Sequence, residues 1–125
     1  MTRINLVHPS ELHQKHLVAE YREIVRVFAL VRNRLEKKTF QDSDIPSEYV
    51  LGSGHVTFFF DKLGFVADRY ESLIREMKVR GYKPNPIRRE ELEDRIDPRL
   101  FKNYVPTPEA LTMNRNRIKD RLPKD

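Results

Sequence analysis

The sequence contains no cysteine and no tryptophan, and it has no long hydrophobic run. The lack of cysteine excludes disulfides and every zinc or redox site that depends on thiolate ligands. No apolar stretch approaches the roughly 18 residues that indicate a membrane-spanning helix. The first residues also lack the apolar centre of a signal peptide. We therefore expect a soluble, cytoplasmic protein.

Signatures of metal and cofactor sites are equally scarce. The four histidines, at positions 8, 13, 16 and 55, do not follow a metal-binding pattern. No glycine-rich phosphate loop and no serine–histidine–aspartate set is visible. Gly52 and Gly54 favour a tight turn over a phosphate-binding role. We expect neither a metal nor a cofactor.

Length and charge indicate the number of domains and the kind of binding partner. The 125 residues suit one domain, 1–125. Lysine and arginine number 24 against 19 acids, which gives a formal charge of +5 and a pI near 9.6. A basic balance favours partners that are polyanions, nucleic acid above all.

Hydrophobic periodicity predicts a mainly α protein. Apolar residues recur at helical spacing over 14–37, which reads as the longest helix, and again over 63–80. Thr107 followed by a proline and a glutamate starts a third helix that runs to about 121. One short helix is expected near 88–95, and the phenylalanines at 58–60 are expected in the core. The sequence thus predicts a compact single domain with three principal helices and long irregular connections.

A basic stripe lies on the first of these helices. Arg22 and Arg26 project opposite the apolar face, and His16 and Glu23 stand beside them. One interpretation is a solvated surface in which Glu23 pairs with Arg26. The other is a phosphate-binding surface, because like charges four residues apart destabilise a helix unless a ligand neutralises them.

The third helix carries a second basic cluster in its C-terminal half, which includes Arg117 and Arg121. Basic residues at a helix C-terminus also stabilise the helix dipole without any ligand. Both interpretations stay open on composition alone.

The N-terminus offers an amine nucleophile. Because Thr2 is small, we expect Met1 to be removed, which leaves the α-amine of Thr2 free. Its reference pKa is roughly 7.7–8.0, against about 10.4 for lysine. Cations nearby would lower that pKa further, and Arg3, Arg22 and Arg26 are candidates. Such an amine can attack a sugar C1′ carbon and form a Schiff base.

Several motifs resemble one family over nearly the whole chain, with 83–103 the vaguest part. They are the opening Met-Thr-Arg-Ile-Asn-Leu, the run of 16–28 with Ala-Glu-Tyr-Arg-Glu at its centre, Gly-His-Val-Thr-Phe-Phe at 54–59 with Asp-Lys-Leu after it, and the region of Tyr104, Pro106, Arg117 and Arg121. In these motifs the chain resembles the phage endonuclease V family, small pyrimidine-dimer glycosylases that also cleave abasic sites.

The resemblance implies specific roles. Thr2 would attack C1′ with its α-amine, and Glu23 would be the acid/base group. The implied DNA-binding residues are Arg3, His16, Arg22, Arg26, Arg117 and Arg121. The partner would be double-stranded DNA containing a lesion, bound by a monomer. The chemistry implied is base displacement, imine formation and β-elimination of the strand.

The chain departs from the family pattern in three places. Arg121 occupies a position where the family has a lysine, and Lys15 a position where it has a glutamine. The aromatic-rich tail of the phage enzyme has no counterpart before Asp125. A cyclobutane pyrimidine dimer is the expected lesion, with another damaged base or an abasic site as the alternative. The competing functions are a non-catalytic basic helical DNA-binding module and a lyase that acts only on abasic sites.

Overall fold

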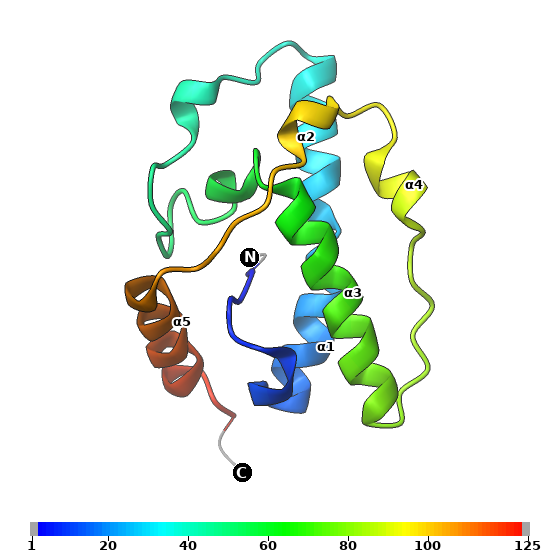
Figure 1. Ribbon diagram of the computed structural model, residues 1–125, viewed down its shortest axis with the longest axis vertical. Coiled ribbons are helices and arrows are strands. Elements are labelled where there is room, and N and C mark those ends of the chain that lie inside the picture. Colours follow the sequence, from blue (N-terminus) through cyan, green and yellow to red (C-terminus); the bar gives the residue numbers. More distant parts are fainter. Residues whose placement is uncertain (1–2, 124–125) are drawn as a thin grey trace.

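The fold is built from helices joined by long irregular segments (Figure 1). The computed structural model describes residues 3–123. Its helices are α1 (Gln14–Glu23), α2 (Arg26–Glu36), α3 (Leu63–Val79), α4 (Arg89–Glu93) and α5 (Pro108–Asp120). Over the described range no strand forms, and the only β-pairing is an isolated bridge between Lys62 and Phe101. The expected mainly α architecture is confirmed.

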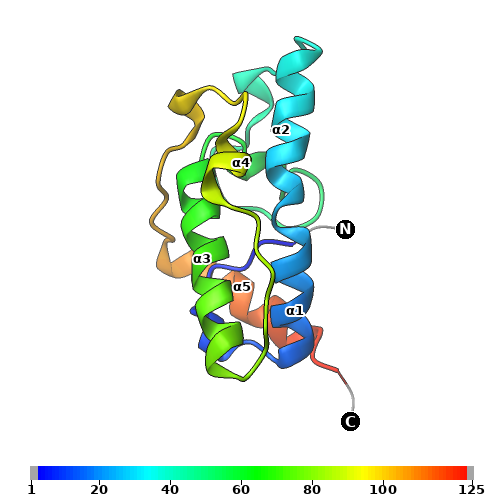
Figure 2. The ribbon, with the colours of Figure 1, turned by 90° about the vertical axis from the view of Figure 1, so that its right-hand side faces the viewer.

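The prediction of one longest helix over 14–37 is wrong. Ile24 and Val25 separate α1 from α2, and the N–H of Val27 bonds the carbonyl of Ile24 at 3.2 Å, a tighter turn than an α-helix makes. Two β-branched residues in succession lower helix propensity at this point. The two helices still follow one another along nearly the same line (Figure 2). The longest helix is instead α3, with 17 residues.

The other helix predictions are confirmed, and their ends follow the capping signals. The hydroxyl of Thr107 accepts a hydrogen bond from the N–H of Ala110 at 3.0 Å, which caps α5. Gly81, which follows the C-cap residue Arg80 of α3, takes a φ of +92° that other residues rarely adopt. The short helix α4 lies inside the range expected for it.

The core forms where α1, α2 and α3 meet the segment between α2 and α3. Figure 1 shows α1 and α3 side by side along the molecule. Phe58, Phe59 and Phe60 are buried, which confirms their assignment to the core. Tyr49 meets Phe58 and Phe59 edge-on, at ring centroid distances of 6.0 and 6.1 Å.

The N-terminal segment, residues 3–8, passes between α5 on one side and the α1–α3 pair on the other (Figure 1). Ile4, Asn5, Leu6 and Val7 are all buried there, although the segment belongs to no helix or strand. Residues 4–7 are therefore part of the interior.

None of the helices within residues 3–123 combines the length and the apolar character needed to span a bilayer.

Candidate active site

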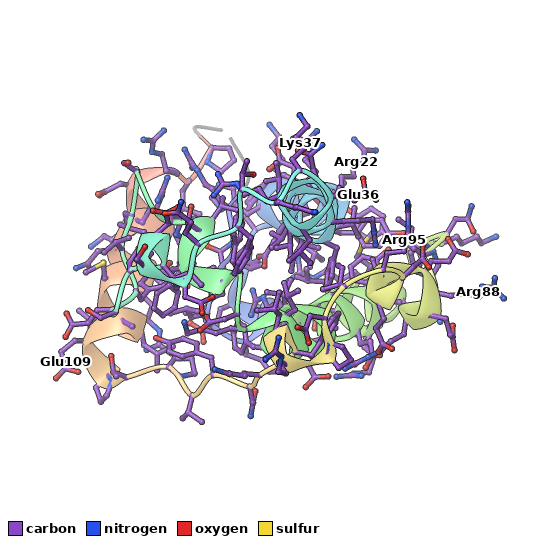
Figure 3. All side chains as sticks on the ribbon, turned by 90° about the horizontal axis from the view of Figure 1, so that it is seen from above. Arg22, Glu36, Lys37, Arg88, Arg95 and Glu109 are labelled. Carbon is purple, nitrogen blue, oxygen red and sulfur yellow. The ribbon has the colours of Figure 1, made fainter. Side chains whose placement is uncertain are left out.

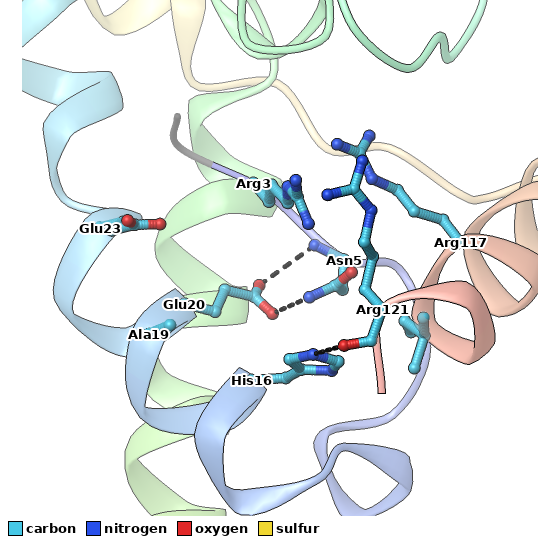
Figure 4. Close-up of a pocket in the computed structure, with 9 residues that line it drawn as sticks. Arg3, Asn5, His16, Ala19, Glu20, Glu23, Arg117 and Arg121 are labelled. Atoms are coloured by element: carbon cyan, nitrogen blue, oxygen red, sulfur yellow. Dashed lines mark hydrogen bonds between the residues drawn. The ribbon is translucent and has the colours of Figure 1, made fainter. Parts of the chain in front are cut away.

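A cavity of about 230 Å³ opens where three parts of the chain converge. The N-terminal segment supplies Arg3 and Asn5, and the other walls come from α1 and the end of α5 (Figure 4). The remaining lining residues are His16, Ala19, Glu20, Glu23, Arg117, Ile118 and Arg121. Helix periodicity explains the α1 wall, because residues 16, 19, 20 and 23 are three or four apart and share one side of the helix.

Three guanidinium groups dominate the charge of this cavity. Burial lowers the pKa of Arg3 from its ordinary value, and the nearby positive charges of Arg117 and Arg121 lower it further. Within residues 3–123 none of the three forms an ion pair with a carboxylate. Their positive field is thus available to an anionic ligand such as a DNA phosphate.

Glu23 is the last residue of α1, and its carboxylate faces the three arginines (Figure 4). Its side chain is 27 % exposed, so it is partly buried rather than exposed as its helix position suggested. The expected pair with Arg26 is present, but Nη1 of Arg26 lies 3.8 Å from Oε1 of Glu23, too far for a hydrogen bond. The carboxylate therefore keeps acceptor capacity for a ligand in the cavity.

A second carboxylate, Glu20, lies at the floor of the cavity and is held by a buried network. Nε of Arg69, on α3, donates to Oε2 of Glu20 at 2.8 Å, and Nη2 donates to Oε1 at 3.1 Å. The side-chain amide of Asn5 donates to the same carboxylate at 2.7 Å. Both ionic side chains are nearly inaccessible, at 1 % and 5 % exposure. With both oxygens occupied, Glu20 has a structural role, and Glu23 is the cavity carboxylate that keeps acceptor capacity.

His16 joins α1 to the end of α5. Its Nε2 lies 2.9 Å from the backbone oxygen of Arg121, which satisfies a carbonyl that the helix itself leaves without a partner. The contact fixes the side of the cavity from which Arg117 and Arg121 project.

A comparison of the sequence with known protein families identifies the family of this chain. Residues 1–90 match the profile of the family described as pyrimidine dimer DNA glycosylase. The chain belongs to this family. It is therefore a DNA repair enzyme of the glycosylase type, which acts on damaged DNA.

The matched range includes only some of the residues that line the cavity. Arg3, His16 and Glu23 fall inside the matched range, whereas α5, with Arg117 and Arg121, lies beyond it. The structure brings all five of these expected site residues to one place.

Two expected DNA-binding residues of this glycosylase lie outside the cavity. Arg22 points outward from α1 (Figure 3) and lines a shallow neighbouring hollow with Lys15 and Tyr82. Arg26 is the first residue of α2, so Arg22 and Arg26 do not share one helix. Repulsion between them within a helix therefore no longer supports a phosphate-binding surface. Thr2, the expected nucleophile, lies outside the described residues.

Sequence reasoning missed a set of buried polar residues, two of which line the cavity; the set is Asn5, Glu20, His55, Arg69 and Asn114. For two of them a signal was present. Glu20 stands on the core face of α1, three residues after Leu17 and four before Ile24, and Arg69 has the same relation to Val66 and Leu73 on α3. Charges on an apolar face require a buried partner.

No group of three or more histidine, aspartate or glutamate side chains in the described part of the chain is placed to hold a metal ion.

Proposed function

We propose that this chain is a bifunctional DNA glycosylase and abasic-site lyase whose nucleophile is the α-amine of Thr2. The observation that carries the proposal is the cavity in which Arg3, the residue bonded to Thr2, meets Glu23 and two arginines of α5. Consecutive Cα atoms are about 3.8 Å apart, so an amine one residue before Arg3 has this cavity within reach. In this cavity the three arginines would favour the unprotonated amine, which is the reactive form.

The reaction proceeds in two stages. The amine nitrogen attacks C1′ of the damaged nucleotide, the C1′–N glycosidic bond breaks, and the base leaves with the electron pair and takes up a proton. Opening of the sugar ring and loss of a proton from nitrogen then give the C1′ imine. Removal of a C2′ proton sends electrons toward C3′, and the 3′ phosphate leaves by β-elimination.

Glu23 is the proposed acid/base group. Its carboxylate opens onto the cavity beside three arginines, where it is placed to accept the C2′ proton. It also stabilises positive charge that develops on the sugar during base loss. Arg3, Arg117 and Arg121 would hold the phosphates beside the lesion, with His16 next to them.

The proposed substrate is double-stranded DNA with a cyclobutane pyrimidine dimer, bound by a monomer in which residues 1–125 form one domain. A panel of duplexes that carry a dimer, an oxidised base or an abasic site tests this choice. A lyase limited to abasic sites would cleave the last duplex alone.

The first prediction tests the nucleophile. Sodium borohydride should trap the protein on dimer-containing DNA, and peptide mapping should place the adduct on Thr2, because borohydride reduces only the imine. Variants that retain Met1 or carry an uncleaved N-terminal tag are the matched controls, and they should give no adduct. An adduct on a lysine would contradict the proposal.

The second prediction tests the phosphate contacts. Arg22→Gln and Arg117→Gln should each reduce the slope of log affinity against log salt by about 0.9, the value for one phosphate contact. Binding should weaken on undamaged DNA as well, since phosphates carry no information about the lesion. Titrations of each variant at several salt concentrations measure the slope.

Arg115→Gln is the control for these titrations. Arg115 lies on the same helix as Arg117 but pairs with Glu11, its Nε lying 3.2 Å from Oε1 of that residue. Its replacement should leave the slope unchanged. If Arg22→Gln also leaves the slope unchanged, the outer face of α1 is only a solvated surface.

A further inference from the structure

Four consecutive backbone N–H groups of the N-terminal segment donate to buried side chains instead of to other backbone atoms. Ile4 donates to Nε2 of His55 at 3.0 Å, and Asn5 donates to Oε2 of Glu20 at 3.3 Å. Leu6 and Val7 both donate to Oδ1 of Asn114, at 2.7 and 3.2 Å. The acceptors come from α1, from α5 and from the loop before α3. The segment is therefore fixed in place by three separate elements.

Among these acceptors, His55 binds the N–H group closest to the N-terminus, that of Ile4. The turn at Gly52 and Gly54, whose φ values are +74° and +86°, directs its ring into the interior, where the residue is 2 % exposed. The ring lies edge-on to Tyr49 and Phe59, at centroid distances of 5.4 and 5.7 Å. It does not line the cavity, so it has no direct access to a DNA ligand.

The hydrogen bonds of His55 define its tautomer. Nδ1 lies 2.8 Å from the carbonyl oxygen of Val50, which can only accept, so Nδ1 carries the proton. Nε2 then presents a lone pair to the N–H of Ile4. A doubly protonated ring could not accept this bond. Burial lowers the pKa of His55, Arg117 and Arg3 add to the effect, and the carbonyl of Val50 and Glu20 oppose it.

We propose that His55 is a positioning residue for the reaction, because its neutral ring holds the Ile4 N–H and thereby the chain that leads to the attacking amine. The inference rests on the proposed amine chemistry. Ile4 is only two residues from Thr2, so a shift of its backbone passes directly to the amine. A displacement of about 1 Å of a reacting group costs about 100-fold in rate.

Two substitutions separate this role from a purely structural one. In His55→Gln the side-chain oxygen can reach the position of Nε2 and still accept from Ile4. In His55→Asn the shorter amide reaches only the position of Nδ1, so it can donate to Val50 but leaves Ile4 without an acceptor. The Asn variant should form the borohydride-trapped adduct about 100-fold more slowly at saturating dimer-containing DNA. The Gln variant should recover most of that loss, and both should bind DNA like the wild type.

The decisive comparison is made at a temperature where circular dichroism shows each variant folded. Equal trapping rates in the Asn and wild-type proteins would overturn the inference and leave the proposed function intact. No adduct with the wild type would overturn the proposed function and the inference with it. An equal loss of trapping rate in the Asn and Gln variants would show that the ring acts through packing, which would also overturn the inference.

Amide hydrogen exchange in the wild type supplies a test that does not depend on the variants. The N–H groups of Ile4, Asn5, Leu6 and Val7 should exchange far more slowly than in an unstructured peptide, since each is buried and bonded. Exchange of Ile4 at the rate of a free peptide would overturn the inference even if His55→Asn failed to fold.

Discussion

Glu23→Gln should lower the single-turnover rate of strand cleavage by about 100-fold or more, the usual contribution of a general acid/base group. Glutamine matches glutamate in shape but cannot accept the C2′ proton, and it removes the negative charge that faces Arg3, Arg117 and Arg121. The fold should persist, since the 3.8 Å contact with Arg26 is the only ion pair of Glu23 in the described residues, and such partly exposed pairs contribute less than about 1 kcal/mol.

The matched control is Glu36→Gln. Glu36 lies at the far end of α2 and pairs with Arg95, its Oε1 lying 2.8 Å from Nη1, well away from the cavity. This variant should cleave at the wild-type rate. Rates under single turnover with saturating enzyme separate the chemical step from binding. Turnover near the wild-type level in Glu23→Gln would remove this carboxylate from the mechanism.

Glu20→Gln should have the largest effect on stability, a loss of about 3–5 kcal/mol, because removal of one partner leaves a buried charge uncompensated. The amide would also present a donor to Arg69 and to Asn5, both of which already donate to this position. A domain of this kind is stable by only about 5–15 kcal/mol, so the loss is a large part of the total. Urea denaturation followed by circular dichroism measures it.

Glu11→Gln provides the comparison. It makes the same chemical change in an exposed pair with Arg115, whose two side chains are 43 % and 53 % exposed, and should cost less than about 1 kcal/mol. The double variant Glu20→Gln with Arg69→Met should be more stable than Glu20→Gln alone, because the unpaired charge is gone. A Glu20→Gln midpoint like that of Glu11→Gln would show that water or rearrangement compensates the charge.

The sequence predicted the elements that depend on neighbouring residues. Apolar spacing and local caps are enough to define α3 and α5, and Thr107 and Gly81 act as expected at their ends. The break between α1 and α2 was not predicted, because it contains neither proline nor glycine. It is a change of hydrogen-bond register at Ile24 and Val25, which tertiary packing decides rather than composition.

Only part of the candidate site could be predicted, because the sequence shows local patterns and not which distant side chains meet. The residue types of α1 and α5 indicated charge and a basic surface, but not which side chains would meet. Asn114 lies among the basic residues of α5, yet it is 1 % exposed and accepts hydrogen bonds from a segment near the other end of the chain. Such a pairing leaves no periodic signal, because it joins residues 108 positions apart.

That separation also has a consequence for the order in which the enzyme becomes active. The N-terminal segment leaves the ribosome first, yet its partners His55 and Asn114 follow 51 and 108 residues behind Ile4 and Leu6. The contact between Leu6 and Asn114 forms only after residue 114 has been synthesised, whereas contacts within α1–α3 have their partners earlier. The cavity therefore cannot form around the N-terminal segment until α5, which carries Arg117, has been synthesised.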